Sequence, residues 1–100
     1  MKWALENLHT DLTVDVLASR AAMSPRNFAR AFSAEIGATP ARFIACARID
    51  AARRKLEDSS KAVDVVAMDC GFGNGERMRR AFHRHLGVAP QAYRERFQTH

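Results

Sequence analysis

The strongest constraint on the fold of this 100-residue chain is an internal repeat. Residues Val14–Ala18 match Val63–Ala67 at an offset of 49, and Arg30–Phe32 match Arg80–Phe82 at an offset of 50. The offset of 50 also relates Gly37 to Gly87, Pro40 to Pro90 and Phe43 to Tyr93. The offset changes between the matched blocks, where a turn tolerates an inserted residue. Because a solenoid array needs at least three copies, the two copies predict a tandem pair of similar modules.

Each copy has the pattern of two short helices joined by a tight turn. In the first copy, Thr13 and Ser24 are favourable helix caps, the second followed by a proline, and Gly37 is a favourable helix end. In the second copy, Asn74 and Gly87 take the places of Ser24 and Gly37. Apolar residues recur at helical spacing in the second helix of each copy: Phe28, Phe32 and Ile36, then Met78, Phe82 and Leu86. Two short helices around such a turn are typical of the helix-turn-helix unit.

Three further segments have helical patterns, and no window shows convincing strand alternation. A first helix is expected around residues 3–8 and a last one over 90–97, and a long helix opens at Thr39 and Pro40 and runs to about Leu56. At about 1.5 Å per residue this long helix spans roughly 25 Å, enough to connect two small modules. The prediction is therefore an all-α fold of seven helices. Its parts are a first helix-turn-helix subdomain at 1–38, a linker helix at 39–57 and a second subdomain at 58–100.

The net charge of +5 is distributed in alternating blocks. Residues 23–56 carry seven basic and two acidic side chains, and residues 71–100 carry six basic and two acidic ones. The segments that hold the first helix of each copy are acidic overall. The two basic blocks thus contain the second helices, which a helix-turn-helix places in the major groove of DNA.

A helical wheel places several polar side chains opposite the apolar stripe of each second helix. In the first copy these include Arg26, Asn27 and Arg30, and in the second Glu76, Arg77, Arg79 and Arg80. The planar fork of arginine can bond the edge of guanine with two hydrogen bonds. Glu76 has two interpretations: it accepts from the amino group of cytosine, or it occupies a favourable first-turn position and pairs with Arg80.

Other classes of function find little support in the residues. No apolar run approaches the roughly 20 residues of a membrane-spanning helix, and the N-terminus does not resemble a signal peptide, so a cytoplasmic location is expected. The four histidines lack partners at metal-ligand spacing, and no nucleophile with a base or phosphate-binding glycine loop is present. We therefore expect no enzyme, no metal and no cofactor. RNA binding is disfavoured because most aromatic residues lie on the apolar stripes.

Cys46 and Cys70 each lie within an apolar helical pattern, and we expect both to be buried free thiols. The alternative to DNA binding is a basic protein-interaction or thiol-redox module that uses one of them. An exposed thiol of low pKa would favour that alternative.

The motifs also resemble those of a known family. Residues 23–32 (MSPRNFARAF), 37–40 (GATP), 70–73 (CGFG), 79–82 (RRAF) and 86–90 (LGVAP) are similar to the DNA-binding domain of AraC/XylS-type transcription regulators. The resemblance covers almost the whole chain. The opening residues 3–8 (WALENL) resemble the GlxA-type branch, in which an amidotransferase-like sensor domain accompanies the DNA-binding domain.

The resemblance implies that the two recognition helices enter successive major-groove segments of an asymmetric DNA site. It also implies RNA polymerase and an N-terminal sensor domain as partners. Base contacts are implied for Arg26, Ala29, Arg30, Gly75, Glu76, Arg79 and Arg80. Phosphate or supporting contacts are expected from Ser24, Asn27, Asn74, Arg77 and the helix N-termini near Pro40 and Pro90. Two positions depart from the family: Ala29 offers only an apolar contact, and Arg77 replaces a small hydroxyl residue.

Overall fold

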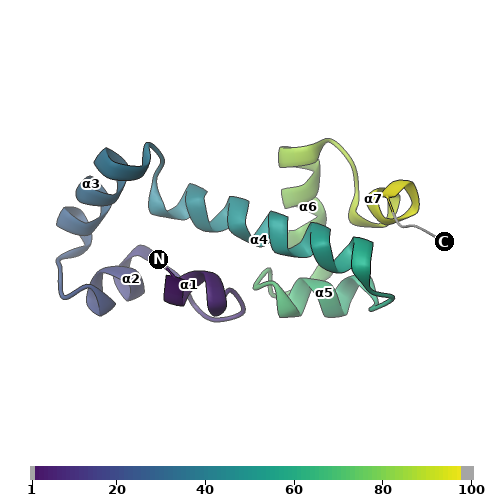
Figure 1. Cartoon of the computed structure of the whole chain (residues 1–100), viewed down its shortest axis with the longest axis horizontal. Coiled ribbons are helices and arrows are strands. Elements are labelled where there is room, and N and C mark those ends of the chain that lie inside the picture. Colours follow the sequence, from purple (N-terminus) through teal and green to yellow (C-terminus); the bar gives the residue numbers. More distant parts are fainter. Residues whose placement is uncertain (1, 98–100) are drawn as a thin grey trace. The chain divides into compact units, whose positions relative to one another are not determined.

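The computed structural model describes residues 2–97, and within this range it contains seven helices and no strand (Figure 1). They are α1 (Lys2–Glu6), α2 (Val14–Arg20), α3 (Pro25–Ile36), α4 (Pro40–Asp58), α5 (Val63–Asp69), α6 (Gly75–Leu86) and α7 (Pro90–Phe97). The predicted all-α fold with seven helices is confirmed. No helix in this range combines the length and apolar character needed to cross a membrane.

The chain divides into two compact units, and the division falls inside α4, between Ala47 and Arg48. The first unit contains α1, α2, α3 and the start of α4, and the second contains the rest of α4 with α5, α6 and α7. Within the first unit α2 packs against α3, and within the second α5 packs against α6. The long helix is thus a component of both units, with its first half in one core and its second half in the other.

Helices α2, α3 and α6 begin directly after the residues that the sequence predicts as their caps. Thr13 Oγ1 accepts a hydrogen bond from the backbone N–H of Val16 at 3.4 Å, and Ser24 Oγ accepts from that of Asn27 at 3.2 Å. Asn74 Oδ1 accepts from the backbone N–H of Arg77 at 2.8 Å. Each bond satisfies a donor that a helix N-terminus leaves free. The starts of the two recognition helices are therefore fixed by local interactions.

The two helix-turn-helix turns share one unusual backbone conformation. Gly71 has φ of 89°, and Ala22, which precedes it by 49 residues, has φ of 57°. In each copy the next residue donates its backbone N–H to the carbonyl five residues earlier, at 2.9 Å. The second copy then has one additional residue, Gly73, with φ of 88° before the cap Asn74. The left-handed conformation suits glycine, so the alanine of the first copy is strained where the second copy is not.

The core of the first unit is small. Ala4, Leu12, Leu17 and Ile44 are buried, and Trp3, Leu8, Phe28 and Phe43 pack partly against them. The ring of Phe32 lies 5.8 Å from that of Phe28 and 5.4 Å from that of Phe43, measured between centroids. Ile36 at the end of α3 remains 48% exposed, so the apolar stripe of α3 is only partly covered.

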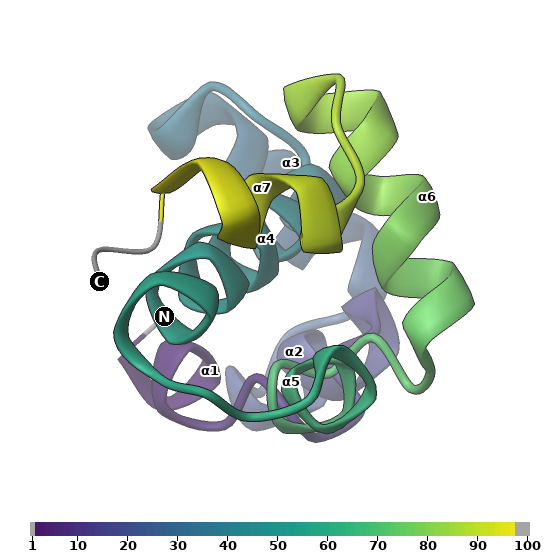
Figure 2. The ribbon, with the colours of Figure 1, turned by 90° about the vertical axis from the view of Figure 1, so that its right-hand side faces the viewer.

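The core of the second unit is more completely enclosed. Met78 and Phe82 of α6 are fully buried, together with Leu56 of α4 and Val66 of α5. Figure 2 shows α7 beside α4 and α6 in this unit. There the hydroxyl of Tyr93 donates to Glu57 Oε2 at 3.0 Å and accepts from Arg53 Nε at 3.1 Å. Tyr93 therefore joins α7 to α4 through polar contacts as well as through its ring.

Candidate nucleic-acid interface

The free face of α3 carries the residues predicted for the first recognition helix. Phe32, on the apolar stripe of α3, is buried, whereas Arg26, Asn27 and Arg30 are exposed. Ala29 is half-buried, and its methyl side chain can make only a small apolar contact. Ser24 is exposed, and although its oxygen accepts the capping hydrogen bond, its hydroxyl hydrogen remains able to donate. This face offers two arginine side chains and several small polar groups to a ligand.

The free face of α6 carries the second predicted set. Met78 and Phe82 are fully buried beneath it, which leaves Glu76, Arg77 and Arg79 exposed. Arg80 is also exposed, and with Glu76, Arg77 and Arg79 it completes the charged part of the face. Asn74 is exposed with its oxygen in the cap, and Gly75 is half-buried. Within each unit, the structure therefore brings the predicted residues together at the start and outer side of the second helix.

Glu76 forms a charged cluster with two arginines of the same helix. Its Oε2 accepts from Arg79 Nε at 2.9 Å, and its Oε1 accepts from Arg79 Nη2 at 2.7 Å and from Arg80 Nε at 3.1 Å. The hydrogen bonds from Arg79 lower the pKa of Glu76 most, and the charge of Arg79 and the hydrogen bond and charge of Arg80 add to this effect. Against the opposing effect of desolvation, they bring the pKa of Glu76 to about 2. The carboxylate is therefore charged at neutral pH. The predicted pair with Arg80 is present, and the stronger two-point pair with Arg79 adds to it.

The start of α6 also lies close to α5, the first helix of the same helix-turn-helix. The carboxylate of Asp64 in α5 lies against the Cα of Gly75, in the space that a Cβ atom would occupy. Asp64, Glu76 and Arg79 line a hollow of about 320 Å³, which the start of α7 completes with Pro90. Glycine at position 75 thus permits a close approach that a larger residue would disturb. No sequence pattern predicts this contact, because Asp64 and Gly75 lie on different helices.

Arg77 differs from the other arginines of α6 in its direction. Its Nη1 lies 3.6 Å from the position of a hypothetical Cβ on Gly73, so the side chain folds back toward the turn. This guanidinium lies beside the helix start and not along the outer face. Such a position favours a contact with the sugar-phosphate backbone over a contact with bases.

The helices that follow the recognition helices begin at the predicted prolines. α4 starts at Pro40 and α7 at Pro90, and both prolines are buried. Thr39 Oγ1 accepts from the backbone N–H of Arg42 at 3.2 Å at the start of α4. The backbone N–H groups of a helix N-terminus attract anions such as phosphate. The structure therefore provides both predicted helix starts, each shortly after a recognition helix.

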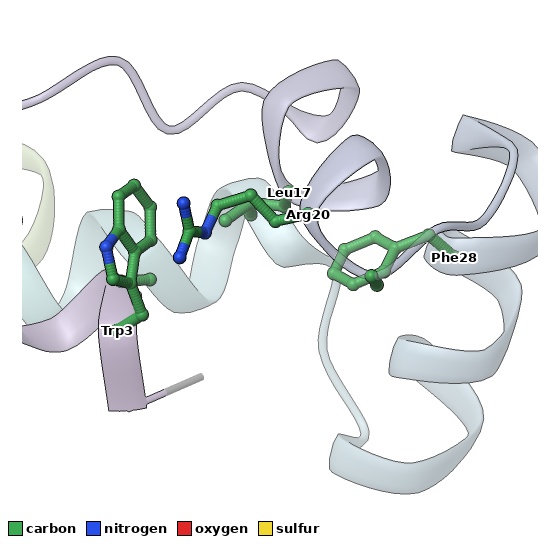
Figure 3. A pocket seen from close by; sticks show the side chains of 6 residues that line it. Trp3, Leu17, Arg20 and Phe28 are labelled. Atoms are coloured by element: carbon green, nitrogen blue, oxygen red, sulfur yellow. The ribbon is translucent and has the colours of Figure 1, made fainter.

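Sequence reasoning did not anticipate a hollow in the first unit, shown in Figure 3. The guanidinium carbon of Arg20 lies 3.6 Å from the centre of the Trp3 ring, an attractive cation–π geometry. Together with Leu17 and Phe28 these side chains line a space of about 280 Å³. Only the packing of α1 against α2 brings Trp3 and Arg20 together, and no sequence signal links two residues at that separation.

The expectation that both cysteines are buried is wrong for Cys46. Cys70 is buried in the second core, and burial raises the pKa of its thiol, whereas Cys46 is exposed. Residues 43–47 are all apolar, but consecutive side chains of a helix point in different directions around its axis, so they cannot all face the core. Of these residues, Ile44 is buried. In the part of the chain that the structure describes, His, Cys, Asp and Glu form no group of three that could hold a metal ion.

Comparison with known proteins gives consistent results. A family model described as a helix-turn-helix domain matches residues 17–96. An HTH-type transcriptional regulator of Mycobacterium tuberculosis is 51% identical over 81 residues, which cover 81% of this chain and 31% of the relative. An AraC-like transcription regulator of Streptomyces antibioticus is 35% identical over 96 residues, covering 92% of this chain and 32% of the relative. The chain spans about a third of the length of these relatives.

Solved structures show the same fold. The DNA-binding domain of AdpA, a global transcriptional factor crystallised in complex with a target DNA, matches with a TM-score of 0.92 and 43% identity. That match covers 96% of this chain and 86% of the AdpA chain. The C-terminal domain of AraT, a response regulator from Geobacillus stearothermophilus, has a TM-score of 0.94 at 21% identity, covering 99% of this chain and 83% of that one. At that identity the second match concerns the fold alone.

Proposed function

This chain belongs to the AraC-type family of helix-turn-helix DNA-binding domains, and we propose that it binds double-stranded DNA sequence-specifically as part of a bacterial transcription regulator. The observation that carries the proposal is the same arrangement in both units. In each, a helix-turn-helix presents exposed arginines opposite a stripe that contains a buried phenylalanine, Phe32 in α3 and Phe82 in α6. The second helix of such a unit is the element that enters the major groove.

The two recognition helices supply the proposed base contacts. In α3 these are Arg26, Ala29 and Arg30. In α6 they come from Arg79 and Arg80, on a surface that also contains Gly75 and Glu76. Arginine suits guanine, whose two acceptors in the major groove match a guanidinium edge, and Ala29 suits the methyl group of thymine. Because the two sets differ, we propose that one domain recognises an asymmetric site, with two segments about 10 bp apart.

Contacts to the DNA backbone would orient the domain without selecting a sequence. We assign them to Ser24, Asn27, Asn74 and Arg77, and to the backbone N–H groups at the starts of α4 and α7. The support is positional: the four side chains lie at the starts of α3 and α6, and α4 and α7 begin shortly after those two helices end. Their removal should weaken binding to every duplex by a similar factor.

The wider regulator is proposed from the relatives, of whose length this chain spans about a third. We propose that a sensor domain forms part of the same protein, that the bound regulator contacts RNA polymerase, and that it acts in the cytoplasm, where bacterial DNA is. Residues 1–38 and 58–100 would act as two DNA-binding subdomains, with 39–57 as the helix between them. Both cores use α4, which supports its role as the connection.

Selection of bound duplexes from a random-sequence DNA pool tests the proposed function. We expect an asymmetric motif with two conserved blocks about one helical turn apart, centred roughly 10 bp from each other. Enrichment of no motif, with binding that depends on salt alone, would overturn sequence-specific recognition. A single palindromic motif would instead contradict the use of two different recognition helices by one domain.

A further inference from the structure

The two recognition helices differ in how their arginines are held. At the offset of 50 residues, Glu76 of α6 corresponds to Arg26 of α3, and Arg80 corresponds to Arg30. The first turn of α3 contains no acidic residue, whereas Glu76 occupies the first turn of α6. Thus a carboxylate replaces an arginine at one position of an otherwise similar surface.

The hydrogen bonds of Glu76 occupy one side of each guanidinium group. Arg79 uses Nε and one hydrogen of Nη2, and Arg80 uses Nε. Within residues 2–97, no hydrogen bond engages Nη1 of Arg79 or either terminal nitrogen of Arg80. A guanidinium has five N–H donors in a rigid plane, so the terminal edge remains able to donate two parallel hydrogen bonds. Two acceptors of guanine fit such an edge.

The cluster also changes the charge that α6 offers to DNA. Two arginines would present two positive charges to phosphates, but the Glu76 carboxylate, charged at neutral pH, cancels one of them. Non-specific affinity for DNA comes from Lys and Arg side chains that neutralise phosphates and release counterions. The hydrogen bonds to Glu76 fix the direction of each guanidinium, so Arg79 or Arg80 can turn away from the outer face toward the sugar-phosphate backbone only if these bonds break. The pairing therefore opposes backbone binding more than it opposes a guanine contact.

We propose that Glu76 is a positioning residue for sequence discrimination: it holds Arg79 and Arg80 with their terminal nitrogens available to bases and keeps both from binding phosphates. This inference rests on the proposed DNA-binding function. All three residues lie on α6, three and four positions apart, so the arrangement does not depend on how the two units are placed. It assigns sequence discrimination at α6 to an acidic side chain on a basic surface.

The substitution Glu76→Gln tests this role, with Glu95→Gln as the matched control. Both residues are exposed, and both changes remove one negative charge, but Glu95 lies on α7 outside the cluster. The probes are fluorescent duplexes with random cores of about 20 bp, which accommodate two segments a helical turn apart, and the motif that the wild-type protein enriches. Titrations over a series of salt concentrations give the affinity and its salt dependence for each probe.

For Glu76→Gln we expect the affinity for random duplexes to rise at least about threefold, and the slope of log K against log salt to become more negative by about 0.9 for each arginine that then binds a phosphate. The affinity ratio of motif to random duplex should fall about tenfold, within the range for loss of one well-placed base contact. Glu95→Gln should leave the slope and the ratio close to their wild-type values. The double variant Glu76→Gln, Arg79→Ala should have a less negative slope than Glu76→Gln alone, because only one of the two released arginines then remains.

Two results would overturn the inference while leaving the proposed function intact. Equal changes for Glu76→Gln and Glu95→Gln would mean that net charge alone is responsible. A loss of motif affinity at one base pair, with unchanged affinity for random duplexes, would mean that Glu76 contacts a base itself. If the wild-type protein enriches no motif, the proposed function fails, and the inference fails with it.

Discussion

Replacing Arg30 by alanine separates base recognition from protein stability, because Arg30 makes no contact that folding requires. Its side chain is exposed, and within residues 2–97 no hydrogen bond or ion pair engages its guanidinium. Truncation opens no cavity, and alanine is a slightly better helix former than arginine. The free energy of unfolding should therefore stay within about 0.5 kcal/mol of the wild-type value in a denaturant titration.

The effect on DNA binding should be much larger and confined to one position. A two-point contact between arginine and guanine contributes about 1 to 3 kcal/mol of discrimination, so affinity for the selected motif should fall about 5- to 150-fold. Substituting the contacted base pair should then cause little further loss. The assay is a titration of the motif and its single-base variants at one fixed salt concentration, since affinities at different salt cannot be compared.

Arg77→Ala provides the contrast, because its guanidinium lies back against Gly73 near the helix start. We expect it to weaken binding to all duplexes by a similar factor and to make the salt slope less negative by about 0.9, as loss of one phosphate contact would. Equal losses on every sequence for Arg30→Ala would refute the assignment of Arg30 to base contact. A base-specific loss for Arg77→Ala would refute its assignment to phosphate.

Three further predictions concern the fold. Ala22→Gly should stabilise the protein by about 0.5 to 1 kcal/mol in denaturant unfolding, because glycine adopts the positive φ of 57° without strain; an unchanged or lower stability would contradict this. Tyr93→Phe should lower the free energy of unfolding by about 1 to 2 kcal/mol, because it removes the hydroxyl that forms hydrogen bonds to two residues of α4. A decrease below about 0.3 kcal/mol would show that these hydrogen bonds contribute little to stability. Under native conditions, iodoacetamide should label Cys46 quickly and Cys70 only slowly, because Cys70 is buried and the pKa of its thiol is raised. Peptide mass spectrometry measures the labelling of each cysteine, and rapid labelling of Cys70 would contradict the prediction.

The helices and their ends follow from the sequence because the signals that specify them are local. Ser24 and Asn74 each bond a backbone N–H three residues away, so a cap can be recognised without knowledge of the rest of the fold. The outward faces of α3 and α6 follow in the same way, since the apolar stripes that contain Phe32 and Phe82 fix the opposite side of each helix.

Local patterns were insufficient where a residue's surroundings come from another helix. The apolar neighbours of Cys46 suggested burial, but a run of apolar residues surrounds a helix while a core covers only part of it. Trp3 and Arg20 stack although neither belongs to a recognisable motif, and Asp64 approaches Gly75 from a different helix. Only the tertiary structure places these partners together.

The sequence by itself determined that this chain forms two helix-turn-helix units, each with arginines on its exposed second helix, because repeat, caps and helical spacing are all properties of short segments. The tertiary structure decided how the charges on those helices are used. It shows Arg79 and Arg80 bonded to Glu76, and Arg77 directed toward the turn. Side chains of one type on one helix thus acquire different partners, because the direction of each depends on the rotamer that its neighbours allow.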